Sequence, residues 1–261
     1  MRIALITGAS SGMGQEYARL ADESERYDEI WAVARREERL AELAKQCTTA
    51  VRPFALDLTK RTSVLHLADE LERASACAGG DFEVGLLVNA AGFGKFGTYA
   101  DLTYGEVDDM IDLNCRALVD VTQAALAHMH RGGRILQFAS SAGFQPLPGM
   151  NVYAASKAFV ISYARALRRE LSGCGIYVTA VCPIWIRTEF VSVARDTANA
   201  NAVKHPWPQL SPKRVARWSL LVNRCNYPIA TCSVFAFLMR IAAKIVPSPI
   251  ITTIWEGLRR L

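Results

Sequence analysis

Short apolar runs that alternate with helix-forming segments are the feature that most constrains the fold of this chain. Each run is rich in β-branched and other apolar residues, and glycines or polar turn residues separate it from its neighbours. The expected strands are residues 2–6, 29–33, 51–56, 84–88, 134–138 and 176–181. Strands that regularly alternate with helices form a parallel sheet covered on both faces. We therefore expect an α/β fold with a doubly wound parallel sheet, in which ligands bind at the carboxyl ends of the strands.

The segments between the apolar runs favour helices. The expected helices cover residues 15–22, 35–46, 60–76, 104–130 and 151–169. Farther along, we expect a mobile helical lid over residues 189–202, an edge strand at residues 227–230, and helices over residues 211–223, 232–246 and 250–261. No internal repeat, linker or low-complexity segment interrupts the sequence, so residues 1–261 are expected to form a single domain.

The first apolar run leads directly into a glycine-rich loop, Thr7-Gly8-Ala9-Ser10-Ser11-Gly12-Met13-Gly14, and then into a helix. Glycines let backbone N–H groups approach a pyrophosphate, and the helix N-terminus adds a partial positive charge. A plain turn is the alternative, but the position between the first strand and the first helix favours a dinucleotide site in a Rossmann-type α/β/α fold. The loop residues expected to bind the cofactor are Gly8, Ser10, Ser11, Gly12, Met13 and Gly14.

Two arginines, Arg35 and Arg36, follow the second expected strand. An NAD-binding fold usually has an Asp or Glu at this distance from the glycine loop, where it binds the ribose 2′-hydroxyl. Guanidinium groups suit a 2′-phosphate instead, so this position favours NADP(H) over NAD(H). The alternative is that the two arginines merely open the next helix and pair with Glu37 and Glu38.

A serine, a tyrosine and a lysine lie close together between residues 140 and 157. Tyr153 and Lys157 are four residues apart in an expected helix and therefore share a face. An ammonium group near a phenol stabilises the phenolate, so we expect Lys157 to lower the pKa of Tyr153 and make it a general acid/base. Ser140 ends a strand and is expected to bring a hydroxyl beside the phenol. A buried tyrosine with a solvated lysine is the alternative for so short a motif.

Taken together, these motifs resemble those of the classical short-chain dehydrogenase/reductase family from Arg2 to about Thr188. The glycine loop is similar to the family's cofactor loop, and Asp57 to its adenine-contacting acidic residue. Residues 89–92 resemble its Asn-Asn-Ala-Gly element, with Ala90 in place of the second Asn. The family's catalytic tetrad is matched in order and spacing by Asn114, Ser140, Tyr153 and Lys157.

The resemblance implies reversible hydride transfer between a nicotinamide and a carbonyl or secondary alcohol. In this family Tyr153 would exchange the proton, Ser140 would bind the same oxygen, and Lys157 would also hold the nicotinamide ribose. Asn114 would anchor a water that connects Lys157 to solvent. The family's spacing selects Ser140 over its neighbour Ser141, which stays open as an alternative.

The same resemblance implies further cofactor contacts. Besides Tyr153 and Lys157, they are Asp57, Leu58, Asn89, Ala90, Ala91, Gly92, Pro183, Ile184, Ile186 and Thr188. Ile184 departs from the family pattern, because a glycine usually follows this proline and lets the backbone lie close to the nicotinamide. A non-catalytic NADPH-binding sensor or scaffold on the same fold is the alternative function. The complete tetrad argues against it, since nucleotide binding alone needs no such set.

The residue composition indicates the cellular compartment and whether a metal site is expected. The seven cysteines are scattered and never spaced C-x-x-C, which favours a reduced, cytoplasmic protein without disulfides. The four histidines, including His205, show no ligand spacing, so we expect no metal site. The start of the chain does not resemble a signal peptide, and no apolar run is long enough to span a membrane. Family members usually assemble, so a homo-oligomer, dimer or tetramer, is expected.

The charge is uneven. The whole chain carries +5, but residues 204–261 carry nine basic residues against the single acid Glu256. These basic residues lie among apolar helices without a nucleic-acid-reading motif, so we expect no nucleic-acid partner.

Residues 1–188 would form the cofactor and catalytic core, and residues 189–261 would form a substrate lid and apolar, basic helices. These helices either cover the core, the substrate pocket or a subunit contact, or lie on a membrane surface. Either alternative suits a lipophilic carbonyl or alcohol substrate.

Overall fold

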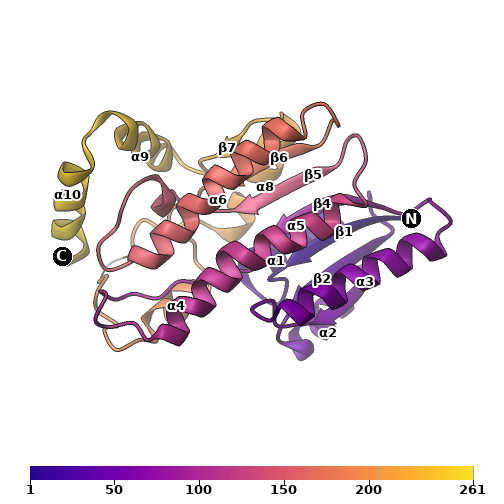
Figure 1. The fold of residues 1–261 in the computed structure, drawn as a ribbon, viewed down its shortest axis with the longest axis horizontal. Coiled ribbons are helices and arrows are strands. Elements are labelled where there is room, and N and C mark those ends of the chain that lie inside the picture. Colours follow the sequence, from indigo (N-terminus) through magenta and orange to yellow (C-terminus); the bar gives the residue numbers. More distant parts are fainter. Residues whose placement is uncertain (205, 261) are drawn as a thin grey trace.

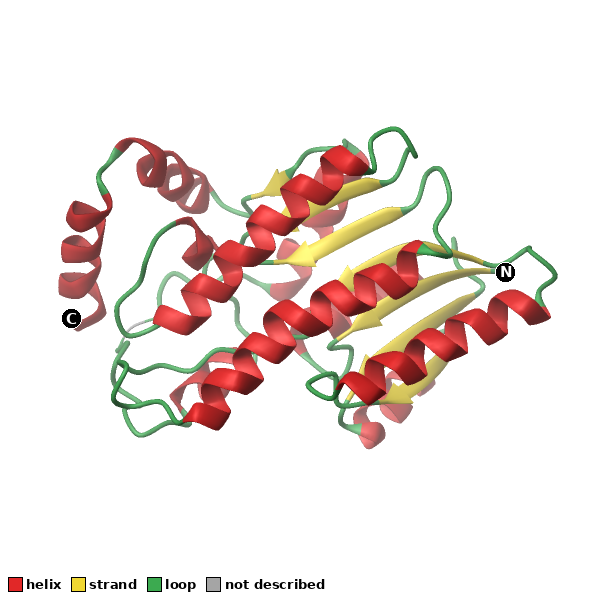
Figure 2. Cartoon of the chain, viewed as in Figure 1, coloured by secondary structure: helices red, strands yellow, loops and turns green. Residues whose placement is uncertain are grey.

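The computed structural model describes residues 1–204 and 206–260, and within them seven parallel strands form one sheet (Figures 1 and 2). The strands are β1 Arg2–Thr7, β2 Glu29–Ala34, β3 Ala50–Ala55, β4 Glu83–Asn89, β5 Arg134–Phe138, β6 Tyr177–Val181 and β7 Ile229–Ala230. Their order across the sheet is β3-β2-β1-β4-β5-β6-β7, and each neighbouring pair is parallel. The α/β, doubly wound fold predicted from the alternation is confirmed.

The sheet reverses direction beside its first strand. The chain proceeds outward from β1 through β2 to β3, then returns to place β4 on the other side of β1. Connections leave β1 and β4 in opposite directions, which opens a crevice at the carboxyl ends of these two strands. In Figure 2 the strand arrowheads point toward the side on which the C-terminal helix lies. The fold therefore directs a ligand toward that end of the sheet.

Helices cover both faces of the sheet. The front layer in Figure 1 contains α3 Arg61–Cys77, α5 Leu118–Leu126 and α6 Asn151–Glu170. The opposite layer contains α1 Gly12–Asp22, α2 Glu37–Gln46 and α8 Pro212–Arg224. Successive side chains of β1 divide between the two: Ile3 and Leu5 join the first core, and Ala4 and Ile6 the second. Because both faces are buried, these strands are apolar throughout rather than alternating.

Two predicted helices differ from the structure. Residues 104–130 form three pieces instead of one: α4 Tyr104–Ile111, a π-helical turn at Asp112–Ala117, and α5, which ends at Leu126. A π-turn inserts an extra residue and rotates the side chains that follow. The lid expected over residues 189–202 is helical only in α7 Phe190–Arg195, and turns follow it.

The C-terminal helices lie beyond the carboxyl ends of the strands (Figure 1). α9 Val234–Ile245 and α10 Ser248–Arg260 match two predicted helices, except that Leu261 lies outside the described residues. Trp255 Nε1 donates a hydrogen bond to the Pro148 carbonyl at 2.8 Å and so ties α10 to the loop before α6. Within residues 1–204 and 206–260, no helix combines the length and apolar character needed to cross a membrane.

Candidate active site

The glycine loop between β1 and α1 forms a tight cradle. Gly8 and Gly12 have φ angles of +71° and +54°, a region that side-chain-bearing residues rarely adopt. A Cβ on Gly8 would lie 2.9 Å from the Ala91 backbone nitrogen, and one on Gly12 would lie 3.2 Å from Thr188 Cγ2. Ser11 is the N-cap of α1, and its side chain makes no capping hydrogen bond in the described structure. The first N–H groups of the helix therefore point into a hollow that fits a pyrophosphate.

Arg36 is held against this loop. Its Nη2 donates to Ser11 Oγ at 2.7 Å and to Ser10 Oγ at 3.2 Å, and its Nε donates to Ser10 Oγ at 3.3 Å. Its Nη1 donates to Glu189 Oε2 at 2.9 Å. Arg35 is exposed and lines the same cavity. The carboxylate partner of Arg36 is thus Glu189, and not Glu37 or Glu38.

The acidic residue after β3 also reaches the cavity. Asp57 lines it, and its Oδ1 accepts hydrogen bonds from Thr59 N at 3.0 Å and Thr59 Oγ1 at 2.9 Å. Leu58, Ala90, Ala91 and Gly92 line it as well. The resemblance places an adenine contact at Asp57 and cofactor contacts at the other four positions.

Asn89 is the exception among the expected cofactor contacts. It does not line the cavity; it is buried at the end of β4, where Nδ2 donates to Thr122 Oγ1 at 2.9 Å and to Gln137 Oε1 at 3.1 Å. An unpaired amide in this core would be costly, and these partners satisfy it. Asn89 thus links β4 to β5 and α5, and the cofactor contact expected for it stays a prediction that this geometry does not support.

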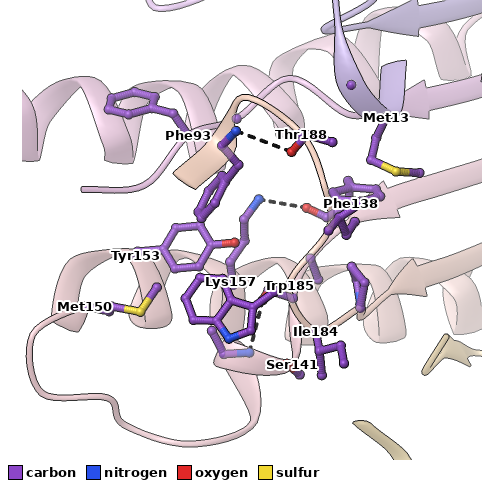
Figure 3. Close-up of a pocket in the computed structure, with 18 of the residues that line it drawn as sticks. Met13, Phe93, Phe138, Ser141, Met150, Tyr153, Lys157, Ile184, Trp185 and Thr188 are labelled. Atoms are coloured by element: carbon purple, nitrogen blue, oxygen red, sulfur yellow. Dashed lines mark hydrogen bonds between the residues drawn. The ribbon is translucent and has the colours of Figure 1, made fainter. Parts of the chain in front are cut away.

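Tyr153 and Lys157 face the cavity from α6, and Figure 3 shows their side chains next to each other. Lys157 Nζ donates to the Phe138 carbonyl at 2.8 Å and lies 5.8 Å from the centroid of the Tyr153 ring. Both side chains are buried, with exposed fractions of 4% for Lys157 and 8% for Tyr153. The alternative of a solvated lysine therefore does not hold.

Burial, and not the ammonium group, dominates the ionisation of Tyr153. It raises the pKa of Tyr153 to about 12, and the Ser140 hydroxyl only partly offsets this rise. Burial also lowers the pKa of Lys157 to about 8. The lowering of the tyrosine pKa that the helical spacing predicts is therefore wrong in this structure. Its phenol holds its proton firmly at neutral pH.

The adjacent serines have different surroundings. Ser140 is the N-cap residue of a short 3₁₀ turn, and its Oγ accepts a hydrogen bond from Ala142 N at 3.1 Å. Its hydroxyl also interacts with the Tyr153 phenol and lowers the pKa of that phenol. The backbone N–H of Ser141 donates to the Pro183 carbonyl at 2.9 Å. Both residues line the cavity. The interaction with the phenol favours Ser140 as the partner of Tyr153.

Asn114 lies in the π-helical turn and is fully buried. Its Oδ1 accepts from Phe93 N at 3.1 Å, and its Nδ2 donates to the Phe93 carbonyl at 2.8 Å and to Ser156 Oγ at 3.0 Å. A Cβ on Gly92 would lie 2.8 Å from Asn114 Oδ1 and 3.3 Å from Lys157 Nζ, so only a glycine fits between these two groups. Asn114 thus fixes the backbone that follows β4 beside the lysine.

One cavity of about 1070 Å³ joins these parts. Its floor is the glycine loop and the carboxyl ends of the strands, and Pro183, Ile184, Ile186 and Thr188 form one side. Figure 3 shows Trp185 and Ile184 among the residues that line the cavity together with Tyr153 and Lys157. The far wall is mainly apolar and comes from the C-terminal helices. Its apolar residues include Phe235, Met239, Ile251, Ile254, Trp255 and Leu258, and Arg259 lines the cavity beside them.

Comparison with known proteins identifies the family. A family model described as short chain dehydrogenase matches residues 2–199. The chain therefore belongs to the short chain dehydrogenase family, and it is an oxidoreductase of that family.

Individual relatives fit this assignment. Sulfoacetaldehyde reductase 2 of Chromohalobacter salexigens is 38% identical over 226 residues, which cover 82% of this chain and 85% of that protein. A short-chain dehydrogenase from Sphingobium yanoikuyae in complex with NADPH has a TM-score of 0.78 at 27% identity, over 96% of this chain and 95% of that chain. The closed form of a serine dehydrogenase complexed with NADP+ has a TM-score of 0.75 at 30% identity, over 88% and 93%.

The sequence did not reveal the roles of two residues at the site, Glu189 and Phe190. Glu189 was expected only as part of a lid, although it is the carboxylate that meets Arg36. Phe190 lies with its ring centroid 5.2 Å from that of Tyr153, and so covers the phenol. The acid directly after Thr188 was a visible signal, but its partner is 153 positions away in the sequence.

Proposed function

We propose that this protein is an NADP(H)-dependent reductase or alcohol dehydrogenase for lipophilic carbonyl compounds or secondary alcohols, with Tyr153 as the general acid/base. The observation that carries the proposal is the single cavity that joins the glycine loop and Arg36 to Tyr153 and an apolar wall. In this proposal residues 1–188 hold the cofactor and the catalytic groups. Residues 189–261 supply the lid and the substrate wall.

The phosphate-binding end supports NADP(H) over NAD(H). Arg36, Ser10 and Ser11 form a connected group of donors at the end of β2, and Arg35 lies next to them. Guanidinium forks and hydroxyls suit a phosphate monoester better than a free ribose hydroxyl. The relatives from Sphingobium yanoikuyae and the serine dehydrogenase, whose structures contain NADPH and NADP+, support the same cofactor.

A bound nicotinamide cofactor supplies or accepts the hydride, and the chain itself supplies the rest. Tyr153 keeps its proton at neutral pH, so in reduction its phenol is ready to protonate the substrate oxygen as negative charge develops there. Ser140 donates a hydrogen bond to the same oxygen. Lys157, fixed to the Phe138 carbonyl, brings a positive charge beside the phenol that stabilises the phenolate once the proton has left. Phe190 and Trp185 exclude water from this end.

The apolar wall supports a lipophilic substrate. Phe235, Met239 and Trp255 face the same cavity as Tyr153 and offer a hydrocarbon or aromatic body a large surface. The 38% identity with Sulfoacetaldehyde reductase 2 favours a second candidate, the reduction of a small sulfonated aldehyde. A sulfonate needs cationic donors near the reacting carbon. Within the described residues of α9 and α10, Arg259 is the one cation that lines the cavity, and its Nη2 is paired with Glu256 Oε2 at 2.8 Å.

A substrate panel tests the proposal. Valerophenone, a steroid ketone, an acyl-thioester ketone, sulfoacetaldehyde and L-serine would each be offered with NADPH or NADP+ and followed by absorbance. We expect the lipophilic ketones to have the highest kcat/KM, and NADPH to be preferred over NADH. Higher kcat/KM for sulfoacetaldehyde would establish the second candidate instead. Stoichiometric NADPH binding without turnover of any compound would contradict catalysis and favour a sensor.

A further inference from the structure

Glu189 bridges two arginines at the edge of the cofactor cavity. Its Oε2 lies 2.9 Å from Arg36 Nη1 and its Oε1 lies 2.6 Å from Arg39 Nη1. Hydrogen bonds from Arg39 and Arg36 hold the pKa of Glu189 below its usual range, so the carboxylate is charged at neutral pH. Both arginines and the carboxylate are partly exposed, with side-chain exposed fractions between 42% and 45%. Solvent weakens such pairs, so the bridge can open at modest cost.

All three nitrogen atoms of the Arg36 guanidinium donate hydrogen bonds while this bridge exists. Its Nε and Nη2 donate to Ser10 and Ser11 of the glycine loop, and its Nη1 donates to Glu189. A phosphate that binds Arg36 through two parallel hydrogen bonds needs one of these donors back. Glu189 is the partner that carries the same charge sign as the phosphate. It is therefore the partner that a phosphate displaces and repels.

The same residue begins the segment that covers the reacting end. Glu189 is the N-cap residue of α7, and the next residue, Phe190, packs on Tyr153 with ring centroids 5.2 Å apart. The carbonyl of Ala194, near the end of α7, accepts a hydrogen bond from Phe96 N at 2.8 Å. Opening the bridge at Glu189 therefore removes one of the contacts that hold the end of the helix beside the phenol, where Phe190 N also donates to Thr188 Oγ1 at 3.3 Å.

We propose that Glu189 is a specificity-determining residue that pairs with Arg36 and yields it to the 2′-phosphate of NADP(H). The inference rests on the NADP(H) preference proposed above. Because the carboxylate competes with that phosphate, Glu189 sets how strongly the site favours NADP(H) over NAD(H). NAD(H) has no group that displaces the carboxylate, so the bridge to α7 stays closed when it binds. The two cofactors thus leave the covering helix in different states.

Direct binding measurements test this without turnover. Dissociation constants for NADPH and NADH would be measured by fluorescence titration for the wild type, Glu189→Gln and the control Glu38→Gln. Glu38 is an exposed carboxylate in α2 that makes no hydrogen bond to Arg36 or Arg39 within the described residues. Since an exposed ion pair contributes up to about 1 kcal/mol, we expect Glu189→Gln to tighten NADPH binding by about threefold to fivefold. NADH binding should change by less than about twofold, and Glu38→Gln should leave both constants within about twofold.

Two more measurements keep the test decisive. Glu189→Asp retains the charge on a shorter side chain, so its NADPH affinity should lie between those of the wild type and Glu189→Gln. Hydrogen exchange at residues 190–195 should rise when NADPH binds the wild type but not when NADH binds, and this difference should disappear in Glu189→Gln. An unchanged or lower ratio of the NADH to the NADPH dissociation constant in folded Glu189→Gln would overturn the role of Glu189. Equal affinity of the wild type for both cofactors would instead refute the proposed NADP(H) preference.

Discussion

Two helices that line the same cavity, α6 and α9, are held by the molecule in very different ways. α6 buries eight of its twenty residues, Tyr153 and Lys157 among them, against the sheet and the neighbouring helices. α9 buries only Ala236 among its described residues, and Leu238 and Ile245 are exposed by 56% and 76%. The catalytic candidates thus lie on a rigid element, and the substrate wall lies on a weakly held one. The catalytic groups on α6 need a fixed geometry, whereas the substrate wall on α9 tolerates change.

α9 itself has two apolar faces. Phe235 and Met239 line the cavity, which matches the expectation of a helix that covers the substrate pocket. Val234, Leu238 and Ile245 recur at helical spacing on the exposed side. The alternative of contact with a membrane surface concerns this second face, and it stays a prediction. Substitutions in each region test whether α6 determines catalysis and α9 determines substrate affinity.

The largest effect is expected from Tyr153→Phe. The substitution removes the phenol proton and keeps the ring that packs on Phe190, so kcat should fall by about a thousandfold or more. The dissociation constant of NADPH should change by less than about threefold, because the ring still fills its place. Steady-state kinetics and NADPH titration of the same preparation check both parts.

Tyr163→Phe is the matched control for this variant. Tyr163 lies on α6 as well, but its side chain does not line the cavity. Its kcat should stay within about twofold of the wild type, since a phenol outside the site plays no part in proton transfer. Near-normal turnover in Tyr153→Phe would remove Tyr153 from the mechanism, and equal losses in both variants would point to damage of the helix instead.

A smaller effect is expected on stability when Lys157 is replaced by Met. Burial holds the pKa of Lys157 near 8 in the folded protein, against an ordinary value of 10.5. Between these values the unfolded chain binds more protons than the folded one, so the contribution of Lys157 to stability rises with pH. The free energy of unfolding of the wild type minus that of Lys157→Met should therefore increase by about 2–3 kcal/mol from pH 8 to pH 10.5.

Urea unfolding across that range measures the difference. Other groups that titrate there, such as Tyr153 and the buried Cys182, are present in both proteins and largely cancel. Lys45→Met, at an exposed position in α2, is the control and should give a difference independent of pH. A flat difference for Lys157→Met would mean that the lysine titrates at its ordinary pKa and is not held in a dry site.

The sequence predicts the first region far better than the second. The strands and the glycine loop follow from local patterns: apolar runs, helix periodicity and turn residues. The same helical period correctly places Tyr153 beside Lys157. The catalytic and cofactor roles of these residues rest on the family resemblance and stay predictions.

What the sequence could not predict depends on contacts between distant segments. The π-turn around Asn114 is fixed by hydrogen bonds to Phe93 across 21 positions, which no helical pattern reveals. Asn89 turns into the core because Thr122 and Gln137 meet it there. α9 is apolar on most of its circumference, so periodicity cannot tell which side faces the cavity.

The smallest effect should distinguish the two faces of α9. Met239 lines the cavity, and its neighbour Leu238 does not. Met239→Ala removes apolar contact with the substrate, which lowers affinity by about 1–1.5 kcal/mol and raises the KM for valerophenone by about tenfold. The kcat and the NADPH dissociation constant should stay within about twofold, because Met239 belongs to neither α6 nor the glycine loop. Leu238→Ala should leave the KM unchanged.

If Leu238→Ala raised the KM as much as Met239→Ala does, the division of α9 into a substrate face and an outer face would be wrong. Equal losses in kcat for Met239→Ala would mean that α9 helps to position the reacting groups, and that the two regions are not independent.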